Sequence, residues 1–292
     1  MAHKTLINGT SYNIGGGETL IGGTSYKINK GKTLINGTGQ NITFGKSVKS
    51  LGIGSSVYMN VGGVRTEFII VHIGNPDTSK YDSTCDGIWI YSKNCYTVAA
   101  YDSTVSLYDY SKKYSTSTIH PWLNGDYYNL ISLSQRKSIK TANIPSIEES
   151  GIATVACNIF LLSINEIGAT KLTLMSESDT GLIGAPLDWF NITKGNTLYD
   201  RWYTEYTNNQ TQIDPTCYYL RDPHVDYNNY GTIRLIDHSY ASIISCDYAS
   251  YTTNKLKLYN KLSFIIKSTP TGIRPAMILL SDSVVDENFN IL

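Results

Sequence analysis

The chain carries one fourteen-residue pattern three times: TLINGTSYNIGGGE at residues 5–18, TLIGGTSYKINKGK at 19–32 and TLINGTGQNITFGK at 33–46. In each copy the Thr-Leu-Ile run predicts a short strand. The Asn-Gly or Gly-Gly pair that follows favours a two-residue turn, because both central positions of a type I′ turn need positive φ. The next run alternates polar and apolar residues, as a half-buried strand does. We therefore expect an N-terminal β-meander of three repeats.

A unit this small cannot bury its own apolar side chains, because isolated two-stranded hairpins are marginally stable at best. Stacking the three units, or pairing them with other subunits, would bury one continuous apolar stripe. We interpret residues 1–46 as a docking or oligomerisation module rather than as a decoration packed on the rest of the chain. The candidate docking residues are Leu6, Ile7, Ile14, Leu20, Ile21, Ile28, Leu34, Ile35 and Ile42.

Residues 47–292 read as one large α+β domain dominated by strands. A Gly-Gly turn at residues 62–63 joins two β-like runs at 57–61 and 64–72 into an expected hairpin. Helices are few: one is expected within 118–133, and Ser163 with Glu166 has the spacing of a capping box that starts another. Further strands are expected at residues 87–91, 96–100, 158–162, 217–220, 231–236, 262–266 and 274–280.

The charge balance excludes several classes of protein. The chain has 24 Lys and Arg against 24 Asp and Glu, so it lacks the basic excess of a nucleic-acid binder. No apolar run approaches the ~20 residues that cross a bilayer, and the N-terminal sequence has no apolar core of a signal peptide. We expect a protein assembled in a cytoplasm. Its five cysteines, read as small buried hydrophobes, are Cys85, Cys95, Cys157, Cys217 and Cys246.

Several short phrases occur in a fixed order along the domain. They are PWLN at 121–124, FLLS at 160–163 with Glu166, Trp202, YLRDP at 219–223 and GIRPA at 272–276. This series resembles a domain family found in bacteriophages and prophages of gut bacteria, usually encoded among tail or other virion genes. The N-terminal repeats look like the leader that often precedes that domain. The order of motifs also resembles the C-type-lectin-like fold of phage receptor-binding proteins, which implies a mixed domain with long loops.

The sequence offers no constellation of catalytic residues. The histidines lack metal-ligand spacing, and the acidic residues offer no pair suited to glycoside hydrolysis. We expect no enzymatic activity, no cofactor and no catalytic or metal site. A calcium loop around Asp77, Asp82 and Asp86 stays open, although its spacing does not match an EF-hand. Arg221 and Arg274 follow apolar strand residues, where an arginine is commonly half-buried and paired with a carboxylate. The residues interpreted as structural are Arg221, Arg274, Trp122 and Trp202.

Tyrosine is unusually common, at 23 residues, and many of these lie in loop-rich stretches. Tyrosine gives large, rigid contact area with a polar tip, which suits protein interfaces or sugar faces, although ordinary half-buried tyrosines are an equal alternative. The candidate surface contacts are Tyr108, Tyr110, Tyr203, Tyr206, Tyr227 and Tyr230.

These observations predict a non-enzymatic structural component of a bacteriophage virion, assembled in the host cytoplasm. Its repeats would dock it to other virion proteins and to copies of itself, and its tyrosine-rich domain would face outward to bind the host surface. A tail or baseplate position is preferred. A capsid or neck decoration, and a carbohydrate-binding adhesin that recognises a host cell-surface glycan, are the alternatives. A cell-wall hydrolase has no convincing carboxylate pair to support it.

Overall fold

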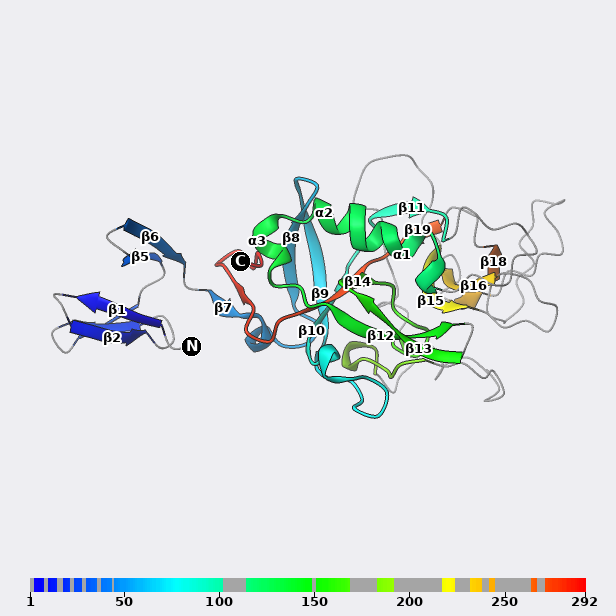
Figure 1. Ribbon diagram of the computed structural model, residues 1–292, viewed down its shortest axis with the longest axis horizontal. Helices are drawn as coiled ribbons and strands as arrows, with labels where there is room; N and C mark the ends of the chain where they lie inside the picture. Colours follow the sequence, from blue (N-terminus) through cyan, green and yellow to red (C-terminus); the bar gives the residue numbers. More distant parts are fainter. Residues whose placement is uncertain are drawn as a thin grey trace.

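Figure 1 shows the computed structural model of the protein, which is built mostly from β-strands with a few short helices. The architecture is therefore α+β and β-dominated, as the sequence predicts. The structure describes residues 3–7, 10–14, 18–21, 24–27, 30–35, 38–43, 45–101, 114–148, 151–168, 183–191, 217–223, 232–237, 242–244, 264–266 and 271–292.

Each repeat contains one antiparallel hairpin, and the pairing register is the same in all three. Ile7 faces Thr10, Ile21 faces Thr24 and Ile35 faces Thr38, so two residues connect the strands of every hairpin. The hairpins form three separate two-stranded sheets at one end of the molecule, apart from the larger sheets (Figure 1). Their strands are β1 (His3–Ile7), β2 (Thr10–Ile14), β3 (Glu18–Ile21), β4 (Thr24–Lys27), β5 (Lys30–Ile35) and β6 (Thr38–Thr43).

The chain enters the globular domain at β7 (Lys46–Ser47), which pairs with β21 (Val284–Val285) near the C-terminal end. Gly45 precedes this pair and lies so close to it that a Cβ atom there would stand 2.7 Å from the Cβ of Val284. Because β7 and β21 are hydrogen-bonded, the two ends of the domain meet at one place. Lys46 and Ser47, on the two sides of the expected boundary, both pair with β21.

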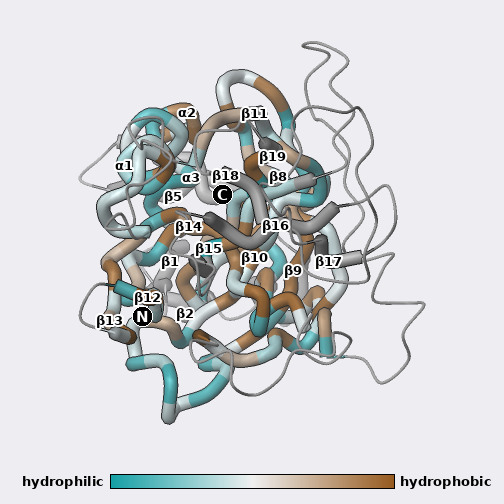
Figure 2. The backbone as a smooth tube through the Cα atoms, turned by 90° about the vertical axis from the view of Figure 1, so that its right-hand side faces the viewer, coloured by the Kyte–Doolittle hydropathy of each residue, from teal (hydrophilic) through white to brown (hydrophobic). Residues whose placement is uncertain are grey.

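The core of the domain is a five-stranded antiparallel sheet with the order β14-β20-β10-β9-β8. Its strands are β8 (Ser56–Val61), β9 (Val64–Gly74), β10 (Gly87–Ser92), β14 (Ile159–Phe160) and β20 (Ala276–Leu279). Val61 pairs with Val64 across the Gly-Gly turn, which confirms the hairpin expected there. Every residue of β10 is buried, and Figure 2 shows hydrophobic segments gathered around β9 and β10.

A second sheet has the order β11-β19-β15-β16-β17, with β18 also paired to β16. Its strands are β11 (Thr97–Ala99), β15 (Cys217–Pro223), β16 (Thr232–Asp237), β17 (Ser242–Ile244), β18 (Phe264–Ile266) and β19 (Thr271–Ile273). The strand expected at residues 274–280 is present as β20, which begins at Ala276 and belongs to the five-stranded sheet. The chain leaves β19 of the second sheet at Ile273 and crosses between the sheets over Arg274 and Pro275, and Pro275 has no N–H to donate to a ladder.

The helix expected within residues 118–133 is present as one continuous stretch made of α1 (Ile119–Trp122), the π-type segment η4 (Leu123–Tyr127) and α2 (Tyr128–Leu130). A separate short helix, α3 (Leu133–Arg136), follows after a break. Asn124 fixes this segment to the sheet, since its side chain donates to the Ile159 carbonyl at 2.9 Å and accepts from the Asn158 N–H at 2.7 Å.

The remaining described elements are a small sheet and four short turns. Strands β12 (Ala142–Glu148) and β13 (Gly151–Cys157) form a two-stranded sheet. The 3₁₀ turns are η1 (Val48–Leu51), η2 (Ser83–Cys85), η3 (Tyr114–Thr116) and η6 (Asp188–Phe190).

The capping box forms, but the residues described directly after it, 164–168, make a turn rather than the expected helix. The Ser163 N–H donates to Glu166 Oε2 at 2.7 Å, and the Glu166 N–H donates to Ser163 Oγ at 3.1 Å. Residues 164–168 make only a hydrogen-bonded turn, which ends at Gly168 with φ +70°. A left-handed glycine commonly ends a helix, and here it does so within the first turn.

Candidate functional site

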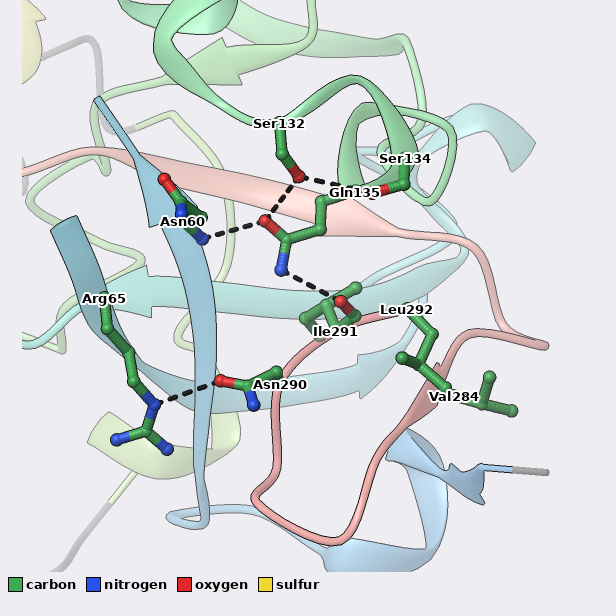
Figure 3. Close-up of a pocket in the computed structure, with 9 residues that line it drawn as sticks. All are labelled: Asn60, Arg65, Ser132, Ser134, Gln135, Val284, Asn290, Ile291 and Leu292. Carbon is green, nitrogen blue, oxygen red and sulfur yellow. Dashed lines mark hydrogen bonds between the residues drawn. The ribbon is translucent and has the colours of Figure 1, made fainter. Parts of the chain in front are cut away.

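The candidate site is an open pocket of about 660 Å³ at the end of the domain that faces the hairpins (Figures 1 and 3). Its lining comes from four separate parts of the chain: the β8–β9 hairpin, the start of α3, β21 and the C-terminal segment. The lining residues are Asn60, Arg65, Ser132, Ser134, Gln135, Val284, Asn290, Ile291 and Leu292. The pocket borders the place where the repeat module joins the domain, because Val284 pairs with Ser47.

Gln135 organises the floor of this pocket. Its buried side chain accepts hydrogen bonds at Oε1 from the Asn60 N–H and from Ser132 Oγ, both at 2.8 Å, and donates from Nε2 to the Ile291 carbonyl at 2.9 Å (Figure 3). Ser138 Oγ donates to the Leu292 carbonyl at 3.0 Å. One amide thus joins α3, β8 and the C-terminal segment, so the floor is held in shape before anything binds.

Arg65 forms one wall of the pocket. Its Nε donates to Asn290 Oδ1 at 3.0 Å and its Nη2 donates to the Asn288 carbonyl at 2.7 Å. The guanidinium also lies over the Tyr58 ring, 3.3 Å from the ring centroid. These contacts hold Arg65 against the C-terminal segment and fix the wall of the pocket that this segment forms.

Leu292 is the one exposed large apolar side chain among the residues that line the pocket. Among the eight large apolar side chains that are exposed in the described ranges, three others are chain neighbours of lining residues. Leu133, between Ser132 and Ser134, is the most exposed at 68%. Val64, Leu133 and Phe289 are not among the residues that line the pocket.

Arg221 is fully buried and makes a buried ion pair with Glu166, with 2.7 Å between Nη2 and Oε1. Its Nε donates to the Pro145 carbonyl at 3.0 Å, and its Nη1 donates to the Leu161 carbonyl. The Tyr81 hydroxyl donates to the same Glu166 oxygen at 2.7 Å. Burial raises the pKa of Tyr81 well above its usual value, with the Glu166 charge adding to the rise. This network ties β15 to β12 and to the turn after β14.

Arg274 joins the two sheets at the point where the chain crosses between them. It is 1% exposed, and its Nε donates to the Ser92 carbonyl of β10 at 2.7 Å. Its guanidinium carbon stands 4.1 Å from the Tyr91 ring centroid and 5.3 Å from that of Tyr218 in β15. The sequence anticipates half-buried arginines at strand ends. Both are fully buried, and they hold sheets together through carbonyls and aromatic rings as well as a carboxylate.

Cys157 and His120 form the nearest approach to a thiol–imidazole pair in the described chain, with 3.8 Å between Sγ and Nδ1. Burial raises the pKa of the Cys157 thiol to about 12, and burial lowers the pKa of His120. Burial likewise raises the pKa of Cys85 to about 11. The thiols are therefore protonated near neutral pH, and a protonated thiol is not a nucleophile. Cys85, Cys95 and Cys157 are buried, which agrees with their interpretation as small buried hydrophobes.

Alkylation should leave Cys85 and Cys157 unmodified in the native protein at pH 7.5. A thiol pKa of 11 to 12 leaves a thiolate fraction of roughly one in a thousand or less, and burial denies access to the reagent. Light iodoacetamide on the folded protein, then heavy iodoacetamide after denaturation, followed by peptide mass spectrometry, measures this. Both peptides should carry the heavy label. Rapid native labelling of Cys157 would instead reveal an accessible, activated thiol.

The aspartates of the suspected calcium loop have local protein partners. Asp77 accepts from the Ser79 N–H and hydroxyl, and Asp82 accepts from the Thr84 N–H and from Asn143 Nδ2. Hydrogen bonds lower the pKa of both carboxyls, led by the Ser79 hydroxyl for Asp77 and by the Thr84 hydroxyl, which also donates to Asp82, for Asp82. Among the described side chains, no group of three or more His, Cys, Asp or Glu could hold a metal ion.

The other residues singled out in the sequence fall in several places. Trp122 is partly buried in α1, and its ring centroid lies 5.6 Å from that of Tyr127. The described docking candidates are Leu6 and Ile7 on β1, Ile14 on β2, Leu20 and Ile21 on β3, Leu34 and Ile35 on β5, and Ile42 on β6. The residues that lie outside the described ranges are Ile28, Trp202, Tyr108, Tyr110, Tyr203, Tyr206, Tyr227 and Tyr230.

Comparison with known proteins identifies the family. Residues 96–281 match the model of a domain of unknown function, DUF6273, and the chain belongs to this family. No curated protein and no solved structure matches the chain. Within the described ranges, no helix is long and apolar enough to cross a membrane. The family match spans α1 and both buried arginines, whereas the repeats and the β8–β9 hairpin lie before it.

Proposed function

We propose that the protein is a non-enzymatic structural component of a bacteriophage virion, most consistent with a tail or baseplate position. The N-terminal hairpins dock it to neighbouring subunits, and the tyrosine-rich domain faces outward to bind the host surface. The observation that carries this proposal is that three hairpins with the same pairing register precede the domain. The first and last parts of the domain itself pair with each other through β7 and β21. The domain therefore does not need the hairpins to complete its sheets, and they are available for attachment to another protein.

The hairpins support a docking role because they lack the layers that stabilise a sheet. Each is a two-stranded sheet, and such a sheet needs a third strand or a packed face to be stable in water. Leu and Ile occupy equivalent positions on the first strand of every hairpin. A neighbouring subunit would cover these apolar residues and convert three weak units into one continuous stack.

The use of the reactive groups in the described chain supports a structural role. The Glu166 carboxylate pairs with Arg221 and accepts hydrogen bonds from the Tyr81 hydroxyl and the Ser163 N–H. Burial raises the pKa of the Cys85 thiol to about 11 and that of the Cys157 thiol to about 12. A catalytic group has to be accessible to substrate, and these buried groups stabilise the fold instead.

We also propose the finer C-type-lectin-like fold for residues 47–292. Its support is the pairing of β7 with β21, which brings the domain ends together, and the combination of short helices with one antiparallel and one mixed sheet. Such folds present long loops on one side for recognition, which agrees with the outward-facing role proposed for the tyrosine-rich stretches.

Deleting residues 1–44 should leave a folded domain that no longer assembles. The deletion keeps β7, so the pairing of Lys46 with Val285 and of Ser47 with Val284 remains intact. We expect a melting temperature within a few degrees of the full chain and loss of incorporation into virions, measured by thermal unfolding and by mass spectrometry of particles from a phage that carries the deletion. An unfolded remainder, or a truncated chain that still incorporates normally, would contradict the docking role.

Purified particles test the virion assignment itself. Electron microscopy with a labelled antibody should place the protein on the tail or baseplate; signal over the capsid or neck would favour the decoration alternative. Absence from purified particles would overturn the proposal. A glycan array with the full chain tests the adhesin alternative, because a host-wall glycan that binds would assign a ligand to the outward face.

A further inference from the structure

We propose that β13 (Gly151–Cys157) is an edge at which two copies of this chain pair, strand against strand and antiparallel, about a twofold axis at Thr154. The pairing joins the β12–β13 sheets of the two copies into one continuous sheet. It goes beyond the docking role proposed for the N-terminal hairpins, because it uses residues of the globular domain alone and does not depend on where the protein lies in a particle.

The outer edge of β13 is open. In the part of the chain that the structure describes, β13 pairs with β12 along its whole length and with no other strand (Figure 1). The five-stranded sheet differs at its β8 edge, where the Tyr58 N–H donates to the Phe289 carbonyl and the Ile291 N–H donates to the Tyr58 carbonyl. The C-terminal segment thus covers that edge strand, whereas β13 has no such cover among the described residues.

The pairing with β12 decides which backbone groups of β13 face outward. Opposed residues of an antiparallel pair alternate between positions that exchange both N–H···O bonds and positions that exchange none. Thr154 lies opposite Pro145, which has no N–H, and the Pro145 carbonyl accepts from Arg221 Nε at 3.0 Å. Thr154 is therefore at a position without exchange, and its N–H and carbonyl face away from β12. By the same alternation, so do those of Ile152 and Ala156.

β13 lacks the features that keep edge strands from pairing. Such edges are usually protected by charged residues, by proline or by a bulge. The sequence GIATVAC at residues 151–157 contains no charged residue and no proline, and its register with β12 has no shift. Ile152, Thr154 and Ala156 are exposed, with Ile152 at 66%. The outward-facing backbone groups are thus accessible to a further strand.

The strand that fits this edge is a second copy of β13. An axis at Thr154 places Thr154 opposite the partner's Thr154 and Ile152 opposite the partner's Ala156, so every outward-facing residue falls at a position that exchanges hydrogen bonds. Self-pairing brings like charges together wherever a strand carries them, and β13 carries none. Opposed threonines are a favourable cross-strand pair. A closed twofold dimer is also the commonest arrangement of identical subunits.

Cysteine substitutions in the full-length chain test the pairing and its register. In Thr154→Cys the substituted positions of the two copies lie opposite one another, with Cα atoms about 5.5 Å apart, which a disulfide spans. In the matched control Ile152→Cys they are offset by four residues, which is about 14 Å along the strands. Under mild oxidation, the covalent dimer of Thr154→Cys should form at least about tenfold faster, because pairing raises the effective concentration of the two thiols.

Peptide mass spectrometry should assign that disulfide to position 154 in both copies. The absence of a covalent dimer, equal rates for the two variants, or a disulfide from position 154 to another segment would overturn the inference.

Charge complementation gives an independent readout. The parent is the double variant Ile152→Cys with Ala156→Cys, whose substituted positions face each other across the axis, so it should crosslink. Adding Thr154→Lys, or adding Thr154→Asp, should lower the dimer yield, since either change sets like charges opposite each other. An equimolar mixture of the two should restore the yield, which also shows that both variants are folded.

A Thr154→Lys variant that crosslinks as well as the parent, or a mixture that fails to crosslink, would contradict self-pairing at this edge. Neither readout involves the hairpins. Loss of virion incorporation on deleting residues 1–44 therefore tests the proposed function separately from this inference.

Discussion

Replacing Glu166 by alanine should lower the free energy of unfolding by about 3–5 kcal/mol, because it leaves the Arg221 guanidinium buried without its counter-charge. Both side chains are completely buried, with 2.7 Å between the paired atoms. The substitution also removes the acceptor of the Tyr81 hydroxyl and of the Ser163 N–H. Equilibrium urea unfolding, followed by tryptophan fluorescence, measures the loss as a shift of the midpoint at constant slope.

Lys93→Ala is the control for this prediction. Lys93 pairs with Glu67 at 3.0 Å, but its side chain is 52% exposed, so water replaces the lost partner and the change should be about 0–1 kcal/mol. The double variant Glu166→Gln with Arg221→Met should be less destabilised than Glu166→Ala alone, since it leaves no unpaired charge in the interior. If Glu166→Ala were as mild as Lys93→Ala, water would have to reach Arg221 in the folded state.

Local patterns in the sequence predict those parts of the fold whose partners are close along the chain. The repeated Thr-Leu-Ile runs and their Gly-containing turns predict two-residue connections, and Ile7 does face Thr10 across one of them. The Gly-Gly turn before Val64 and the capping-box bonds of Ser163 follow from the same short-range chemistry. In each case the interacting groups lie within a few residues of one another along the chain.

The pocket could not be predicted, because its residues meet only through long-range contacts. Gln135 bonds to Asn60, which is 75 residues earlier, and to Ile291, which is 156 residues later. A glutamine in a Ser-rich stretch has the composition of an exposed turn, and its burial depends on where the C-terminal segment lies. Glu166 poses the same difficulty, since its spacing to Ser163 predicts a cap while its second oxygen serves Arg221.

The second large effect is expected at Trp89, the fully buried centre of the five-stranded sheet. Its ring makes edge contacts with Tyr81 and Phe160, both at 5.5 Å between centroids, and its Nε1 donates to the Cys85 carbonyl at 3.0 Å. Trp89→Ala should lower the free energy of unfolding by about 3–5 kcal/mol through the cavity it leaves. Trp89→Phe retains most of the side-chain volume but removes the donor to the Cys85 carbonyl, so it should lower the free energy of unfolding by about 1–3 kcal/mol.

Trp122→Ala is the matched control, because Trp122 is only partly buried and so should leave a smaller cavity. The two large predictions are also linked through Tyr81, which packs on Trp89 with its ring and donates to Glu166 with its hydroxyl. Either single variant frees Tyr81 to move, so the second substitution has less left to disrupt. Trp89→Ala combined with Glu166→Ala should therefore fall short of the sum by about 0.5–3 kcal/mol, as contacting residues do. Strict additivity in the urea midpoints would mean that the aromatic cluster and the ion pair stabilise the domain independently.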